Sequence, residues 1–153
     1  MIENIYIDAD SCPRKVRDYV AQRIKKLEIH LYFVANKEIP TESTCVTMIV
    51  CPKEKDSADN FIFENAKKHD IVITKDILLA SRLVERNICA MNDRGTSFTK
   101  DNISGLLKDR EFNLQLSQIG FKGSKQKSYS TQQFLKFTQT FDKELKRLLN
   151  EYW

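Results

Sequence analysis

The sequence predicts an α/β fold, a three-layer sandwich in which helices cover both faces of a mostly parallel five-stranded sheet. Short runs rich in Val, Ile and Tyr alternate along the chain with stretches whose apolar residues recur every three or four positions. Aspartates directly follow two of the short runs, at Asp8 and Asp76. Strands joined by helices in this way predict the sheet order 3-2-1-4-5, with the first and fourth strands adjacent.

Three strands are expected in the first third of the chain. Residues 2–8 form the first strand. A helix begins at Pro13, where a missing N–H costs nothing, and its apolar spacing continues to Leu27. The second strand is expected at 29–34. The third, at 45–50, is apolar almost without interruption, which predicts burial on both of its faces.

The later elements are signalled mainly by caps and turns. Asp56 or Ser57 begins a helix that ends near His69, a β-branched strand follows at 71–74, and Asp76 caps the next helix. The remaining expected elements are a strand at 88–91, a turn at 92–95, two short helices around 103–107 and 114–119, a polar loop at 120–128 and a last helix. The last helix is expected to start with a capping box formed by Ser130 and Gln133. Its apolar stripe consists of Phe134, Phe137, Phe141, Leu145, Leu148 and Leu149.

We expect a single domain over residues 1–153, with 121–153 as a basic loop and C-terminal helix packed on the rest. Residues 1–120 carry 18 basic and 18 acidic residues, whereas 121–153 carry seven basic and three acidic ones. A basic segment beside an acidic pocket suits a polyanion, although a Lys-rich helix also simply keeps a surface solvated. The acidic N-terminal residues and the lack of a long apolar run predict a cytoplasmic protein without membrane association. A homo-oligomer remains an open alternative.

Five aspartates occur at three places in the sequence, and we expect their side chains to lie close together at one edge of the sheet. They are Asp8 with Asp10, Asp56 with Asp59, and Asp76. Oxygen ligands of this kind suit Mg²⁺ or Mn²⁺, and a cation offsets the repulsion between crowded carboxylates. Asp8, Asp10 and Asp76 are the candidate catalytic residues, and all five are candidate metal ligands. The plainer alternative is that Asp10 shapes a turn while Asp56 and Asp76 are ordinary helix caps. Asp18 and Asp70, by contrast, are expected to be surface charges.

Several polar residues are candidates for contacts with the substrate. Ser11 and Thr74 lie at the expected edge and could orient water, while Lys75 and Arg94 could contact a phosphate. The basic segment adds Lys122, Lys125 and Lys127, which could grip a nucleic-acid backbone.

The four cysteines do not indicate a zinc site or a disulfide framework, because no Cys-x-x-Cys pair is present. They are expected to be reduced thiols. Cys12 lies at a predicted helix start, a position that lowers the pKa of a thiol. Only four residues separate it from Arg17, whereas the thiol phosphatase signature needs five, so that activity is rejected.

Several short segments, which follow one another in the same order along nearly the whole chain, resemble the YaiI/YqxD family of uncharacterised bacterial proteins. The segments are residues 8–13, 56–59, 69–80, 91–95, Gly120-Phe121, Phe137 and Phe141. The family is grouped with the PIN-like nuclease fold, so the resemblance implies metal ligation by Asp8, Asp10, Asp59 and Asp76, with Asp56 as a further ligand. The family usually has proline where this chain has Asp93.

Three functions are compatible with these observations. The first is a Mg²⁺- or Mn²⁺-dependent nuclease that hydrolyses phosphodiester bonds of RNA, or of single-stranded or flapped DNA; RNA is favoured over DNA by the resemblance. The second is a nucleic-acid or nucleotide binding module without catalytic activity. A weaker third alternative is a haloacid-dehalogenase-type phosphatase with Asp8 as nucleophile, although Cys12 stands where that motif has Thr or Val and a late Asp-Asp pair is missing.

Overall fold

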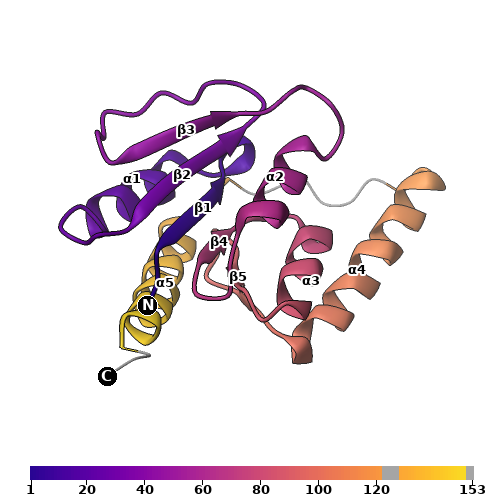
Figure 1. The fold of residues 1–153 in the computed structure, drawn as a ribbon. Coiled ribbons are helices and arrows are strands. Elements are labelled where there is room, and N and C mark those ends of the chain that lie inside the picture. Colours follow the sequence, from indigo (N-terminus) through magenta and orange to yellow (C-terminus); the bar gives the residue numbers. More distant parts are fainter. Residues whose placement is uncertain (122–127, 151–153) are drawn as a thin grey trace.

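The chain folds around a mostly parallel sheet with helices on both faces (Figure 1). The computed structural model describes residues 1–121 and 128–150. Within them the strands are β1 (Asn4–Asp8), β2 (His30–Ala35), β3 (Val46–Val50), β4 (Ile71–Ile73), β5 (Cys89–Met91) and β6 (Ser97–Phe98). The helices are η1 (Ala9–Ser11), α1 (Arg14–Arg23), α2 (Ser57–Asn65), α3 (Ile77–Glu85), α4 (Lys100–Gln118) and α5 (Thr131–Leu149).

The sheet order is β3-β2-β1-β4-β5-β6. This confirms the predicted order of the first five strands, which are parallel to one another. The sixth strand, β6, was not predicted and pairs antiparallel with β5. The tight turn between β5 and β6 contains Gly95 at φ 84°, where a side chain would also collide with the backbone of Lys136.

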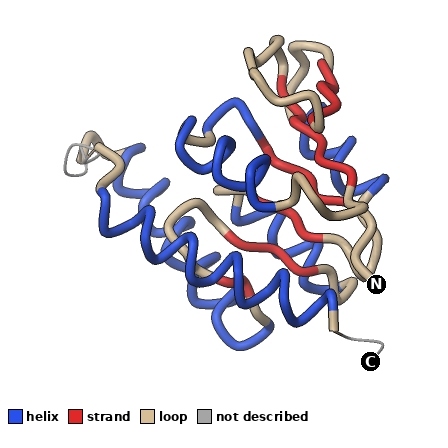
Figure 2. The backbone as a smooth tube through the Cα atoms, turned by 90° about the vertical axis from the view of Figure 1, so that its left-hand side faces the viewer, coloured by secondary structure: helices blue, strands red, loops and turns tan. Residues whose placement is uncertain are grey.

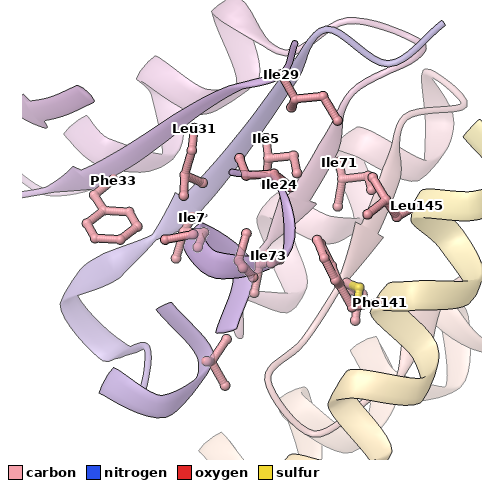
Figure 3. Packing of buried hydrophobic residues seen from close by; sticks show 14 of the residues in the cluster. Ile5, Ile7, Ile24, Ile29, Leu31, Phe33, Ile71, Ile73, Phe141 and Leu145 are labelled. Carbon is pink, nitrogen blue, oxygen red and sulfur yellow. The ribbon is translucent and has the colours of Figure 1, made fainter. Parts of the chain in front are cut away.

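The core is divided by the sheet into two layers, as the alternation of side chains along β1 illustrates. Ile5 and Ile7 pack with α1 and α5, while Tyr6 faces α2 and α3. Figure 2 shows the strands between helices on both sides, and Figure 3 shows Ile5, Ile7, Ile73 and Phe141 meeting in the first layer. The predicted stripe of α5 supplies four buried residues to this layer, Phe137, Phe141, Leu145 and Leu148.

Two local predictions about caps are confirmed. The Asp76 side chain accepts a hydrogen bond from the Leu79 N–H at the start of α3. Ser130 and Gln133 form the reciprocal hydrogen bonds of a capping box at the start of α5. Both signals are local in the sequence, and each side chain reaches the backbone only three residues away.

Three predictions about elements are wrong. β3 lies at the edge of the sheet, so none of its residues is fully buried and Val50 is 56% exposed. One helix, α4, replaces the two expected short helices and begins with its own capping box at Thr99. The α2 helix ends at Asn65, earlier than expected.

Asp70 is a fourth correction, because it is a buried residue and not a surface charge. It is 1% exposed, at the start of β4. Its carboxylate accepts hydrogen bonds from the backbone N–H groups of Asn4 and Lys67, at 3.0 and 2.9 Å. Burial raises its pKa. Asp18, as expected, is exposed and pairs with Arg14 at 3.5 Å.

None of the helices within residues 1–121 and 128–150 combines the length and the apolar composition that a membrane span requires.

The Asp70 carboxylate provides a test of this corner of the fold. Asp70→Ala leaves the N–H groups of Asn4 and Lys67 without their acceptor, and we expect it to lower the free energy of unfolding by about 2 kcal/mol. Asp18→Ala, which removes an exposed ion pair, should change it by less than about 0.5 kcal/mol. Urea unfolding followed by circular dichroism measures both. Equal effects of the two substitutions would contradict this account of Asp70.

Candidate functional site

The carboxyl ends of β1 and β4 lie side by side and carry the centre of the acidic edge. Parallel pairing sets Ile7 opposite Ile73, so the residues that follow in each strand, Asp8 and Thr74, are neighbours. Thr74 is buried, and its hydroxyl donates a hydrogen bond of 3.1 Å to the Asp8 carboxylate. The same hydroxyl oxygen accepts from the Asp76 N–H at 3.0 Å. Thr74 therefore links the ends of the two strands, at the edge where it was expected.

Asp76 and Asp59 bring two more carboxyl groups to this edge, beside that of Asp8. Asp76 is fixed at the N-terminus of α3 by its cap. Asp59, in the first turn of α2, shares a side-chain hydrogen bond with Asp76. Burial, this hydrogen bond and the charges of Asp76, Asp8 and Asp56 raise the pKa of Asp59 to about 8. This raised pKa favours the protonated, uncharged form of Asp59 in the folded protein.

Asp8 is the third member of the group. Burial raises its pKa to about 6, against the opposing effect of the Thr74 hydrogen bond, and the charges of Asp10 and Asp76 add to the rise. The structure thus brings Asp8, Asp59 and Asp76 into mutual electrostatic contact. Elements far apart in the sequence (β1, α2 and α3) supply them.

Asp10 and Asp56 lie at the margin of this group. Asp10 is exposed on η1, and its carboxylate accepts a hydrogen bond of 2.9 Å from the Asn36 N–H. Asp56 occupies the N-cap position of α2 with φ 62°, yet its side chain makes no cap hydrogen bond. The interpretation of Asp56 as an ordinary side-chain cap is therefore wrong.

Asn36 belongs to the acidic edge and was missed from the sequence. It directly follows β2, donates its N–H to Asp10 and accepts a hydrogen bond of 3.3 Å from the Ser57 hydroxyl. It therefore ties η1 to the start of α2. The rule that located Asp8 and Asp76, a polar residue at the carboxyl end of a parallel strand, would also have found Asn36.

The donor set fits a hard divalent cation in its chemistry. All the groups are oxygen donors. Burial is the largest cause of the raised pKa values of Asp8 and Asp59, and the charges of neighbouring carboxylates add to the rise. Within the described part of the chain, however, no three His, Cys, Asp or Glu side chains are placed so that they could hold one ion as they stand. Ligation by three carboxylates requires rotation of at least one side chain.

The residues expected to contact substrate differ in their exposure and in their partners. Ser11 is exposed at the end of η1, and Arg94 is exposed in the turn after β5. The Lys75 ammonium lies 3.4 Å from Oδ2 of Asp93, whose side chain is 3% exposed. Apart from this ion pair, the Asp93 carboxylate has no hydrogen-bond partner in the described chain. Lys122, Lys125 and Lys127 lie outside the described residues.

The pKa of the Cys12 thiol is raised, which corrects the expectation of a lowered pKa. Burial raises its pKa to about 12, and the nearby charge of Asp93 adds to the rise, outweighing the opposing effects of Arg17 and Lys75. Desolvation of the thiolate is therefore stronger than any effect of the helix that follows. This agrees with the rejection of a thiol phosphatase.

A cleft of about 700 Å³ lies between α1 and the loop that precedes β3. Its basic side chains are those of Arg14, Arg17 and Lys25. None of the five acidic candidates lines it.

Comparison with known proteins gives one consistent result. Residues 6–147 match the model of the "Uncharacterized BCR, YaiI/YqxD family". A UPF0178 protein of Treponema denticola is 37% identical over 147 residues, which is 96% of this chain and 94% of the relative. A UPF0178 protein of Geobacter metallireducens is 34% identical over 148 residues, 96% of each chain. No solved structure matches the chain.

The raised pKa of Asp59 predicts how stability depends on pH without metal. The folded state binds the Asp59 proton more tightly than the unfolded chain does, so stability falls as the pH rises from about 4 to about 8. In EDTA, Asp59→Asn should raise the melting temperature at pH 8 and change it little at pH 4, where Asp59 of the unfolded chain is only partly ionised. Glu64→Gln, on the exposed side of the same helix, should show no such difference. An equal effect of Asp59→Asn at both pH values would contradict the assignment.

Proposed function

The chain belongs to the YaiI/YqxD family of uncharacterised bacterial proteins, and we propose that it is a divalent-metal-dependent nuclease that hydrolyses phosphodiester bonds. The observation that supports this most directly is the convergence of Asp8, Asp59 and Asp76. Carboxyl groups held at raised pKa destabilise the free protein when they ionise, and a bound cation would offset this cost. Mg²⁺ or Mn²⁺ is the proposed cofactor.

Asp8, Asp59 and Asp76 are the proposed ligands, and Asp10 and Asp56, at the margin of the group, are further candidates. When bound, the ion would stabilise charge on the phosphoryl oxygens and activate water. A proton on Asp59 would have to leave before its carboxylate could ligate the ion. Thr74 keeps the Asp8 carboxylate in place, and the cap of α3 does the same for Asp76. These fixed orientations leave Asp59 as the ligand that can adjust.

Basic groups near the acidic edge support a nucleic acid as the substrate. Arg14 and Arg17 lie at the start of α1, which directly follows η1, and they line the large cleft together with Lys25. The excess of basic residues after position 120 acts in the same direction. RNA is the proposed substrate ahead of single-stranded or flapped DNA. The PIN-like fold assignment is part of this proposal, supported by the sheet order and the acidic edge.

A second candidate is a nucleic-acid or nucleotide binding module without hydrolytic activity. It is favoured by the finding that no three side chains of the described residues are already set to hold an ion. This candidate predicts salt-dependent binding that does not require the acidic cluster.

Amide substitutions test the nuclease without removing the contacts that hold the edge together. Asn at position 76 still accepts from the Leu79 N–H, and Asn at position 8 still accepts from the Thr74 hydroxyl. We expect the double variant Asp8→Asn/Asp76→Asn to lose at least about a hundredfold in cleavage of labelled RNA or single-stranded DNA in Mn²⁺, because metal-ion catalysis supplies several kcal/mol.

The control is Glu28→Gln, which removes an exposed carboxylate just before β2, at the opposite end of the parallel strands from the acidic edge, and should leave the rate unchanged. Filter binding on the same proteins separates the two candidates. Binding by the wild-type protein without cleavage above that of the double variant would refute the nuclease and support the binding module.

A further inference from the structure

A second cavity begins one residue after Asp76. It is a groove of about 310 Å³ between the start of α3 and the second half of α4. Figure 1 shows α4 alongside α3, on the side away from the rest of the sheet, and the two helices are in contact. The groove is lined by Ile77, Leu106, Leu114, Asn113, Ser117, Asp109 and Arg110. Because Ile77 adjoins Asp76, the groove opens beside the acidic edge.

The lining follows one face of α4. Leu106, Arg110, Asn113 and Ser117 recur at spacings of three and four, which places them on the same side of a helix. Leu106 and Arg110 are half-buried, whereas Asn113 and Ser117 are exposed. No residue of α4 is fully buried, although the helix has 19 residues. Its second half therefore presents a face that the rest of the described chain leaves only partly covered.

We propose that this groove binds a nucleobase of the substrate, next to the phosphodiester at the acidic edge; the inference rests on the proposed nuclease function. Ile77, Leu106 and Leu114 offer apolar surface for the faces of a base. Asn113, Ser117 and Asp109 offer donors and acceptors for its edges. Pockets for small ligands are mainly apolar with a few polar groups, as this one is.

The size and position of the groove favour this occupant. A volume of about 310 Å³ is at the lower limit for small-ligand sites, which suits one base with its sugar and is too small for a helix of a partner protein. A base in the groove would lie next to Asp76 through Ile77, so its own phosphate would be directed to the acidic edge. The groove would then hold the substrate strand in place and distinguish among bases.

Substitutions on opposite faces of α4 test the proposal. Ser117→Leu fills the groove with a side chain that favours helix and adds no aromatic surface, while Gln115→Leu places the same side chain on the opposite face. Affinities of both variants and of the wild-type protein are measured by fluorescence anisotropy in EDTA. The two probes are a short labelled single-stranded oligonucleotide and the same backbone with abasic sites.

The wild-type protein should prefer the base-containing strand by about tenfold, the scale of one stacked base. Ser117→Leu should lose this preference, and Gln115→Leu should keep it. The proposal is overturned if the wild-type protein binds both probes equally or binds neither, or if Ser117→Leu keeps the full preference. Melting temperatures confirm that both variants are folded.

The outcome is separable from that of the nuclease test. Metal-dependent cleavage without a groove-dependent base preference would refute only the groove. A groove-dependent preference without cleavage would refute the nuclease and leave the groove as part of a binding module. As an independent measurement, a nucleoside monophosphate should shift the methyl NMR signals of Leu106 and Leu114, and unshifted signals would contradict the proposal.

Discussion

The repulsion among three carboxylates at the carboxyl edge of the sheet is the constraint on which the rest of the structure depends. Parallel pairing of β1 with β4 fixes the backbone of Asp8 beside Thr74, and the cap of α3 fixes Asp76 two residues later. These groups cannot move apart without breaking the centre of the sheet. The Thr74 hydroxyl and the N-terminus of α3 offset part of the repulsion, and the raised pKa of Asp59 favours its protonated, uncharged form. A cation would replace that proton with a stronger interaction.

Fold features with local signals could be predicted from the sequence, and those that depend on distant residues could not. Caps at Asp76 and Ser130 involve partners three residues away, so their patterns are visible in the chain. The edge position of β3 depends on which strands pair, and its apolar residues look the same in the sequence whether or not a neighbour covers them. Asp70 is buried only because the Asn4 backbone, 66 residues away, meets its carboxylate.

The same distinction applies to the candidate site. The strand-end rule placed Asp8, Thr74 and Asp76 at one edge, and the contacts among them agree with it. It did not reveal that Lys75 is paired with a buried Asp93, because that contact depends on how the turn after β5 folds over β4. The ion pair holds the Lys75 ammonium 3.4 Å from the buried Asp93 carboxylate, although the Lys75 side chain is still 46% exposed. A phosphate would have to compete with Asp93 for that charge.

The acidic edge and the groove beside it complement each other physically. Carboxylates alone repel a polyanion, so a nuclease must supply binding free energy from parts of the substrate other than the scissile phosphate. Ile77 and Leu106 provide apolar contact at a place where Asp76 would face the phosphate, and stacking contacts are insensitive to the repulsion. On the proposed function, the partly covered second half of α4 would also have a role. It adjoins Asp76 through Ile77, where an uncharged contact with a nucleic acid would offset the repulsion from the carboxylates.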